Sequence, residues 1–132
     1  KKVDASLLSD LIYKGVVPVM APLTHDGEGN MFNTNADTIA GETAKALAQF
    51  FDVTLVFCFE KKGVLRDEND DDSVIPQITP AEFNQYVADG IIQGGMIPKL
   101  ENSFEAINAG VSEVVITLAS AINGDSGTRI KK

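Results

Sequence analysis

Three short apolar runs, separated by segments with helical spacing, limit this chain to few architectures. The runs cover residues 16–21, 53–59 and 114–118, and all are rich in β-branched side chains. Continuous runs of this length are typical of strands that are buried on both faces, as in a parallel sheet. Helices between such strands form layers on the sheet. The pattern therefore predicts an α/β domain of three layers, α/β/α, with a mostly parallel open sheet.

The segments between the runs carry helix and turn signals. Apolar residues within residues 7–12 fall on one helical face, and Gly15 is placed to end that helix. Small side chains at helical spacing over residues 36–47 give a narrow face that lets a helix lie close to a sheet or a ligand. Thr79-Pro80-Ala81-Glu82 is a strong helix start, with a Thr cap, an early Pro and a Glu three residues after the cap. Residues 24–30 have turn chemistry and predict a hairpin or an exposed loop.

Composition indicates one globular domain, residues 1–132, of which 44% are hydrophobic and 23% charged. The net charge of −8 argues against a nucleic-acid or membrane-surface partner, because both need clustered Lys and Arg. No apolar run approaches the roughly 20 residues that span a bilayer. Cys58 is the single cysteine, and the first residues lack the apolar stretch of a secretion signal. These features favour the reducing cytoplasm.

Three polar clusters stand where α/β proteins bind ligands, at the ends of strands and the starts of helices. They are residues 33–37, the loop Glu60-Lys61-Lys62-Gly63, and residues 94–99, where two glycines precede a helix and Lys99. Glycines let backbone N–H groups approach phosphate oxygens, and a helix N-terminus favours negative charge. A lysine one turn inside the helix adds a full positive charge. The glycine pair matches neither a Walker nor a dinucleotide-binding pattern.

Each cluster also has an ordinary structural interpretation. Asn33 and Asn35 are common turn and cap residues before a helix. Asp37, in the first helical turn, complements the helix dipole. Lys99 by itself would usually be a solvated surface lysine. The acidic stretch 67–72 lacks a calcium-loop pattern, so a solvated loop is expected there and no metal site is assigned.

Several motifs follow one another along nearly the whole chain. They are Gly15-Val16-Val17-Pro18-Val19-Met20-Ala21-Pro22, Asn33-Thr34-Asn35-Ala36-Asp37, Ile78-Thr79-Pro80-Ala81-Glu82, Gly94-Gly95-Met96-Ile97-Pro98-Lys99 and Gly127-Thr128-Arg129-Ile130. In this order and spacing they resemble the amino-acid kinase family, and within it the acetylglutamate kinases. The resemblance implies the fold of that family's C-terminal, ATP-binding lobe.

The resemblance also implies an activity. Such kinases move the γ-phosphoryl group of MgATP to the side-chain carboxylate of an N-acyl-L-glutamate, a step of arginine biosynthesis. Lys99 would supply positive charge to the transferring phosphoryl, Asp37 would orient catalytic lysines by ion pairing, and Asn33 would hydrogen-bond the acylglutamate. Magnesium would arrive with ATP. The residues implied to contact the nucleotide are Glu60, Lys61, Lys62, Gly63, Ile91, Ile92, Gln93, Gly95 and Met96.

Departures from the family pattern qualify these expectations. Position 60 is Glu where relatives usually carry Asp, and Lys61-Lys62 replaces a more apolar pair. The family's first glycine-rich loop, its second catalytic lysine and most of its acylglutamate pocket belong to an N-terminal lobe, and none of them is visible before Lys1. The isolated chain is therefore expected to be poorly active. The resemblance also implies that the intact enzyme is a homo-oligomer. The alternatives are a non-catalytic nucleotide-binding or assembly fragment, or an amino-acid kinase with a different acceptor.

Overall fold

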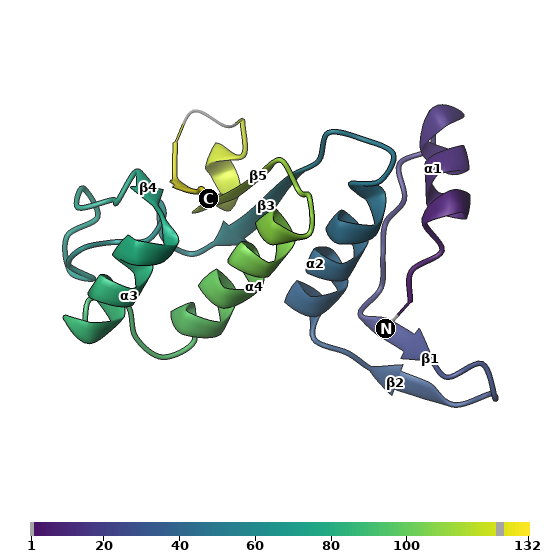
Figure 1. Cartoon of the computed structure of the whole chain (residues 1–132), viewed down its shortest axis with the longest axis horizontal. Helices are drawn as coiled ribbons and strands as arrows, with labels where there is room; N and C mark the ends of the chain where they lie inside the picture. The colour runs from purple at the N-terminus through teal and green to yellow at the C-terminus, as the bar shows by residue number, and fades with distance from the viewer. Residues whose placement is uncertain (1, 124–125) are drawn as a thin grey trace.

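A four-stranded mixed sheet forms the centre of the computed structural model, which describes residues 2–123 and 126–132 (Figure 1). The strand order is β3-β5-β6-β4. β3 pairs with β5 and β4 pairs with β6 in parallel, whereas β5 and β6 are antiparallel. The predicted α/β class with a mostly parallel open sheet is confirmed. The strands are β3 (Thr54–Phe59), β4 (Gln77–Ile78), β5 (Glu113–Leu118) and β6 (Thr128–Ile130).

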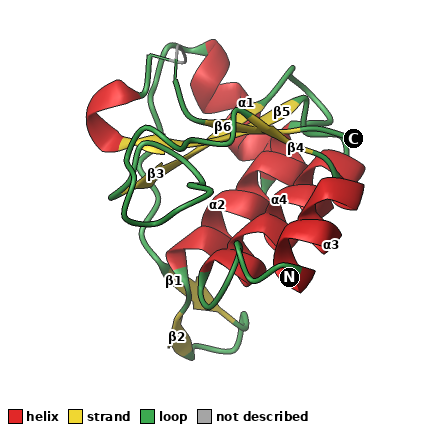
Figure 2. Cartoon of the chain, turned by 90° about the vertical axis from the view of Figure 1, so that its left-hand side faces the viewer, coloured by secondary structure: helices red, strands yellow, loops and turns green. Residues whose placement is uncertain are grey.

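Four α-helices accompany this sheet in the described part of the chain. They are α1 (Ala5–Tyr13), α2 (Ala36–Leu47), α3 (Pro80–Ala88) and α4 (Met96–Asn108). α2 packs against β3 and α4 against β5 and β6, while α1 contacts α2 and α3 contacts α4. Figure 2 shows α2, α3 and α4 on one side of the sheet. The core lies between this helical layer and the strands, with Leu100 and Ile116 fully buried. No described helix is long and apolar enough to cross a membrane.

The two long strands differ in burial. β5 lies inside the sheet, and Val114 through Thr117 are buried, as the apolar run predicts. β3 is at the edge of the sheet, where Leu55 and Phe57 face the core but Val56 and Cys58 are exposed. The prediction of two-sided burial is therefore wrong for β3, because the described helices cover only one of its faces. Cys58 accordingly lies on the surface rather than in the core.

The first apolar run, residues 16–21, does not form a strand. Val17 and Val19 are 82% and 93% exposed. A strand needs a partner for its backbone hydrogen bonds, and within the described residues no strand pairs with this run. Pro18 further removes one N–H donor. The prediction of a buried strand here is wrong.

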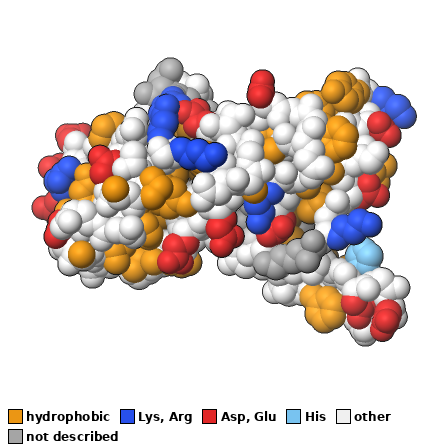
Figure 3. All heavy atoms as spheres, viewed as in Figure 1, with side chains coloured by type: hydrophobic (Ala, Val, Ile, Leu, Met, Phe, Trp, Pro, Cys, Tyr) orange, Lys and Arg blue, Asp and Glu red, His pale blue; other side chains and the backbone are white. Residues whose placement is uncertain are grey.

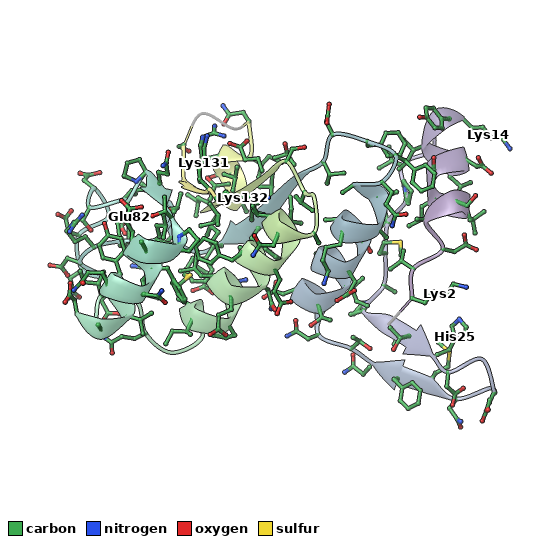
Figure 4. All side chains as sticks on the ribbon, in the orientation of Figure 1. Lys2, Lys14, His25, Glu82, Lys131 and Lys132 are labelled. Carbon is green, nitrogen blue, oxygen red and sulfur yellow. The ribbon has the colours of Figure 1, made fainter. Side chains whose placement is uncertain are left out.

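A β-hairpin follows this run, as the turn chemistry of residues 24–30 predicts. β1 (Leu23–His25) pairs antiparallel with β2 (Met31–Asn33). The Asp26 carboxylate closes the turn by accepting hydrogen bonds from Glu28 and Asn30. Figure 4 shows His25 on this hairpin, away from the helical layer.

The starts of the helices follow their capping residues. Asn35 caps α2 by accepting a hydrogen bond from the Thr38 amide, so one ordinary interpretation of the Asn-rich segment is confirmed. Thr79 and Glu82 form the predicted capping box at α3. α4 begins after Gly94 and Gly95, and none of the described side chains caps it. Backbone carbonyls take their place, because the Met96 and Ile97 amides donate to the Gln93 and Gly94 carbonyls, each at 3.2 Å.

Candidate functional site

The N-terminal turns of α2 and α4 meet, and an ion pair joins them. Lys99 Nζ donates to Asp37 Oδ2 at 2.8 Å, which links residues 62 positions apart. The Lys99 side chain is 13% exposed and that of Asp37 is 40% exposed. Lys99 is therefore not the solvated surface lysine that its local sequence alone would suggest. The structure brings together the two residues predicted to be catalytic.

Two aromatic rings of β3 complete the surroundings of the Lys99 ammonium group. Its Nζ lies 4.8 Å from the centroid of the Phe57 ring and 5.9 Å from that of Phe59. Both distances fall within the range of a cation–π contact. A largely buried charge needs such compensation, because removing it from water is costly. The sequence interpretation assigned no site role to either phenylalanine.

Phe59 also forms part of the wall of a cavity of about 800 Å³, which neither Lys99 nor Asp37 lines. This volume is in the range of small-molecule sites. Much of its lining is apolar; Lys61 and Arg66 add positive charge, and Asp67 and Glu68 add negative charge. The predicted nucleotide contacts that line it are Lys61, Gly63, Ile91, Ile92, Gln93, Gly95 and Met96. The residues that sequence reasoning missed are Phe59, Val64, Leu65, Arg66, Asp67, Glu68 and Gly90.

Glu60 and Lys62, also predicted to contact the nucleotide, do not line this cavity. Lys62 Nζ instead lies 2.9 Å from Asp72 Oδ1. The hydrogen bond between them lowers the pKa of Asp72 and raises that of Lys62. Lys61 donates to the Glu68 carbonyl at 3.3 Å and lies 3.6 Å from Asp71. The two adjacent lysines therefore occupy different positions, and Lys61 is the one at the cavity.

Gly63 has a structural role in addition to its place in the cavity wall. A Cβ at this position would lie 2.8 Å from Thr128 Oγ1 and 3.0 Å from Val74 Cγ1. Thr128 is fully buried, accepts a hydrogen bond from the Val64 amide at 2.8 Å and donates to the Ile75 carbonyl at 2.7 Å. The base of the loop that carries the lysines is thus fixed to β6 through a close approach that only glycine allows.

A smaller cavity of about 320 Å³ lies against the small-residue face of α2. Ala36, next to Asp37, lines it together with Leu55. Residues next to the ion pair therefore line both cavities: Ala36 lines the smaller one and Phe59 the larger one. Asn33 is exposed at the end of β2 and lines neither of these two cavities. The structure does not bring its side chain to the ion pair.

Charge is distributed unevenly around the site. Figure 3 shows acidic side chains over the end of the molecule that α3 and the adjoining loop form. In residues 2–123 and 126–132, no group of three or more His, Cys, Asp or Glu side chains is placed to hold a metal ion. The acidic loop instead binds its own lysines and backbone amides.

The fold and the site define an α/β domain with a charged site at helix starts beside a ligand-sized cavity. The model of the amino acid kinase family matches residues 1–118, so the chain belongs to that family. It is 86% identical over its full length to the acetylglutamate kinase of Bacteroides thetaiotaomicron, of which it covers 51%. The chain spans about half the length of the curated relatives it matches.

Two solved structures share the fold. The smu.665 protein of Streptococcus mutans superposes with a TM-score of 0.80 at 30% identity, over 99% of this chain and 49% of that one. The N-acetylglutamate synthase of Neisseria gonorrhoeae superposes with a TM-score of 0.84 at 20% identity, over 100% of this chain and 31% of that one. The Streptococcus protein is similar to this chain in both sequence and fold, whereas the likeness to the Neisseria protein shows the fold alone.

Proposed function

We propose that this chain supplies the nucleotide-binding part of a kinase that transfers the γ-phosphoryl group of MgATP to the side-chain carboxylate of an N-acyl-L-glutamate, a step of arginine biosynthesis. The observation that carries the proposal is the Lys99–Asp37 pair, whose lysine lies 5.9 Å from the Phe59 ring in the wall of a cavity of about 800 Å³. The name and 86% identity of the Bacteroides relative support the choice of acceptor.

The chemistry requires two anions to approach each other. Catalysis of phosphoryl transfer is mostly positioning and neutralisation of charge at the transferring group. Lys99 provides a cation for this purpose, and Asp37 fixes where its ammonium group lies. Asp37 attacks nothing in this mechanism. The positive end of the α4 dipole also favours an anion, although the Met96 and Ile97 amides already donate to the Gln93 and Gly94 carbonyls.

The nucleotide is proposed to occupy the larger cavity. Apolar side chains such as Val64 and Ile92 offer a surface for a base, and Lys61 and Arg66 offer charge for phosphates. Arg66 is held by Tyr86, over whose ring its guanidinium lies at 5.4 Å. Magnesium enters with ATP as part of the substrate. Glu60 and Lys62 would contact the nucleotide only if the loop of residues 60–73 changed its conformation.

The complete enzyme is proposed to extend beyond these 132 residues. Relatives of about twice the length support this, because they leave room for a second catalytic lysine and for the acylglutamate pocket. We further propose that the intact enzyme is a cytoplasmic homo-oligomer without nucleic-acid or membrane partners. The role of Asn33 in binding the acylglutamate belongs to the same proposal.

Calorimetry with the 132-residue chain tests nucleotide binding. We expect weak binding of ATP and of its non-hydrolysable analogue AMP-PNP, and weaker binding of both by the Lys99→Met variant. Absence of binding at millimolar nucleotide, with a folded chain by NMR, would instead support a purely structural fragment. A coupled ADP-release assay with N-acetylglutamate should give little turnover. Turnover comparable to that of a full-length relative would overturn the proposed need for further residues.

A further inference from the structure

The charge of Lys99 is only partly balanced by Asp37. The lysine side chain is 13% exposed, whereas its carboxylate partner is 40% exposed and shares its charge with water. The remaining surroundings of the ammonium group include the rings of Phe57 and Phe59. Aromatic faces carry partial negative charge and stabilise a cation without bearing a net charge.

The two rings reach Lys99 because of strand geometry. Phe57 and Phe59 are two positions apart on β3, so both side chains point to the face of the sheet that α2 and α4 cover. Phe57 is 5% exposed and lies within the core, where its ring has a packing role in any case. Phe59 ends the strand and is only partly buried.

Phe59 also forms part of the wall of the larger cavity, whereas Phe57 does not line it. One ring thus contacts both the lysine and the space proposed for the nucleotide. An acidic side chain at position 59 would also stabilise the Lys99 ammonium group. However, it would cancel the positive charge that a phosphate group needs and would itself repel that phosphate group. A ring does neither, so an uncharged π-face suits a lysine that must stay available to an anion.

We propose that Phe59 is a positioning residue, whose ring holds the Lys99 ammonium group next to the wall of the nucleotide cavity so that it faces the transferring phosphoryl group. The inference rests on the proposed function for the identity of that group. Phe57 supports Lys99 from within the core, and Phe59 sets where the ammonium group emerges beside the cavity.

NMR of the chain labelled at lysine Cε tests the contact directly. Both rings should shift the Lys99 ε-CH₂ resonances upfield, with Phe57 the nearer at 4.8 Å against 5.9 Å, so Phe59→Leu should remove the smaller, measurable part of that shift while Phe59→Tyr keeps it. Phe104→Leu is the matched control, because it removes a ring that packs on Phe83 at a centroid distance of 5.5 Å. It should leave the Lys99 resonances in place. Unchanged Lys99 resonances in Phe59→Leu would overturn the proposal.

Binding measurements test the consequence for the nucleotide. Phe59→Leu should weaken AMP-PNP binding about two- to fivefold, the range of an exposed to half-buried cation–π contact, and should change ADP binding little. Fluorinated phenylalanines at position 59 keep the shape of the ring but deplete its π-density. They should weaken AMP-PNP binding stepwise, an effect that a merely structural role would not produce. An equal loss for AMP-PNP and ADP, or no dependence on fluorination, would overturn the positioning role.

The two tests separate the proposals. If the wild-type chain binds no nucleotide, the proposed function fails, yet the Lys99 resonances still report whether Phe59 holds the lysine. If Phe59→Leu does not fold, the fluorinated chains decide the question, because they change the electrostatics of the ring with little change in its volume.

Discussion

Two lysine-bearing regions beside the larger cavity are held in opposite ways. Lys99 pairs with a residue 62 positions away, and its side chain is 13% exposed. Lys62 pairs with Asp72, only 10 positions away, and these side chains are 51% and 90% exposed. The first pair exists only when α2 and α4 are packed together. The second needs only the loop of residues 60–73 to keep its local shape.

This difference separates a fixed charge from an exchangeable one. An exposed ion pair contributes little to stability, since water and salt replace either partner readily. The lysines of the loop can therefore turn to a phosphate group at little cost. Lys99 cannot leave its place without exposing the contact between two helices, so its position is set before any ligand arrives.

The largest effect is expected from Asp37→Ala. This variant leaves the Lys99 charge largely buried against the two aromatic rings, without its carboxylate partner. Breaking a fully buried pair costs about 3–5 kcal/mol. Because Asp37 is 40% exposed, we expect a loss of about 2–3 kcal/mol in the free energy of unfolding, measured by urea denaturation.

The double variant Asp37→Ala/Lys99→Met is its control. It removes both charges, so its loss of stability should be smaller than the sum of the two single losses. Additive losses, or a loss below about 0.5 kcal/mol for Asp37→Ala, would show that the pair is as weakly coupled as an exposed one. The contrast between the two regions would then be wrong.

The next effect concerns how the loop is anchored. Thr128→Val keeps the side-chain shape but leaves the Val64 amide without its acceptor and removes the donor to the Ile75 carbonyl. An unsatisfied buried group of this kind costs about 1–2 kcal/mol. The loss should appear in urea denaturation and as faster hydrogen exchange at Val64. Thr117→Val is the matched control, because its side chain is equally buried but its hydroxyl contact to Ala121 is longer, at 3.5 Å. Equal losses in the two variants would show that Thr128 is not a special anchor.

Sequence reasoning predicted the elements whose cause is local. The Thr79 capping box, the hairpin and the buried strand β5 follow from residues close together in the chain. The strand prediction failed at residues 16–21, because apolar character predicts burial but does not supply a partner for strand pairing. The edge position of β3 was missed for the same reason, since strand order depends on contacts between distant segments.

The site was predictable to a similar extent. The family motifs indicated Asp37 and Lys99, and the structure joins them. The two aromatic residues of β3 predicted a strand but gave no sign that both rings lie against a lysine 40 residues or more downstream. Adjacent Lys61 and Lys62 looked equivalent in sequence, and only the path of the acidic loop separates them.

A small effect on stability is expected from the exposed pair. Lys62→Gln and Asp72→Asn should each leave the urea midpoint nearly unchanged, because water solvates both partners well in the native and the unfolded chain. Any loss should disappear at about 1 M salt, because the interaction between exposed charges then extends over only about 3 Å. A loss comparable to that of Asp37→Ala would show that the loop is held by its charges rather than by Thr128.

The smallest and most local effect is on titration of the same pair. Hydrogen bonding to Lys62 lowers the pKa of Asp72 from its ordinary value of 3.8, and the pKa of Lys62 is raised above 10.5. A lowered carboxyl pKa adds stability above 3.8 that is lost as the pH falls through the folded-state pKa. A raised lysine pKa adds stability below 10.5 that is lost as the pH rises through its folded-state pKa.

NMR titration of the carboxyl carbons can measure this shift directly. Lys62→Gln should return the pKa of Asp72 toward 3.8. The pKa of Glu82 is lowered by its hydrogen bonds with Thr79, at the start of α3, and should not change in this variant, so it serves as an internal control. If the pKa of Asp72 is already at its ordinary value in the wild-type chain, the pair does not form in solution. Lys62 would then be free to meet a nucleotide without releasing a carboxylate, and the distinction between Lys61 and Lys62 would weaken.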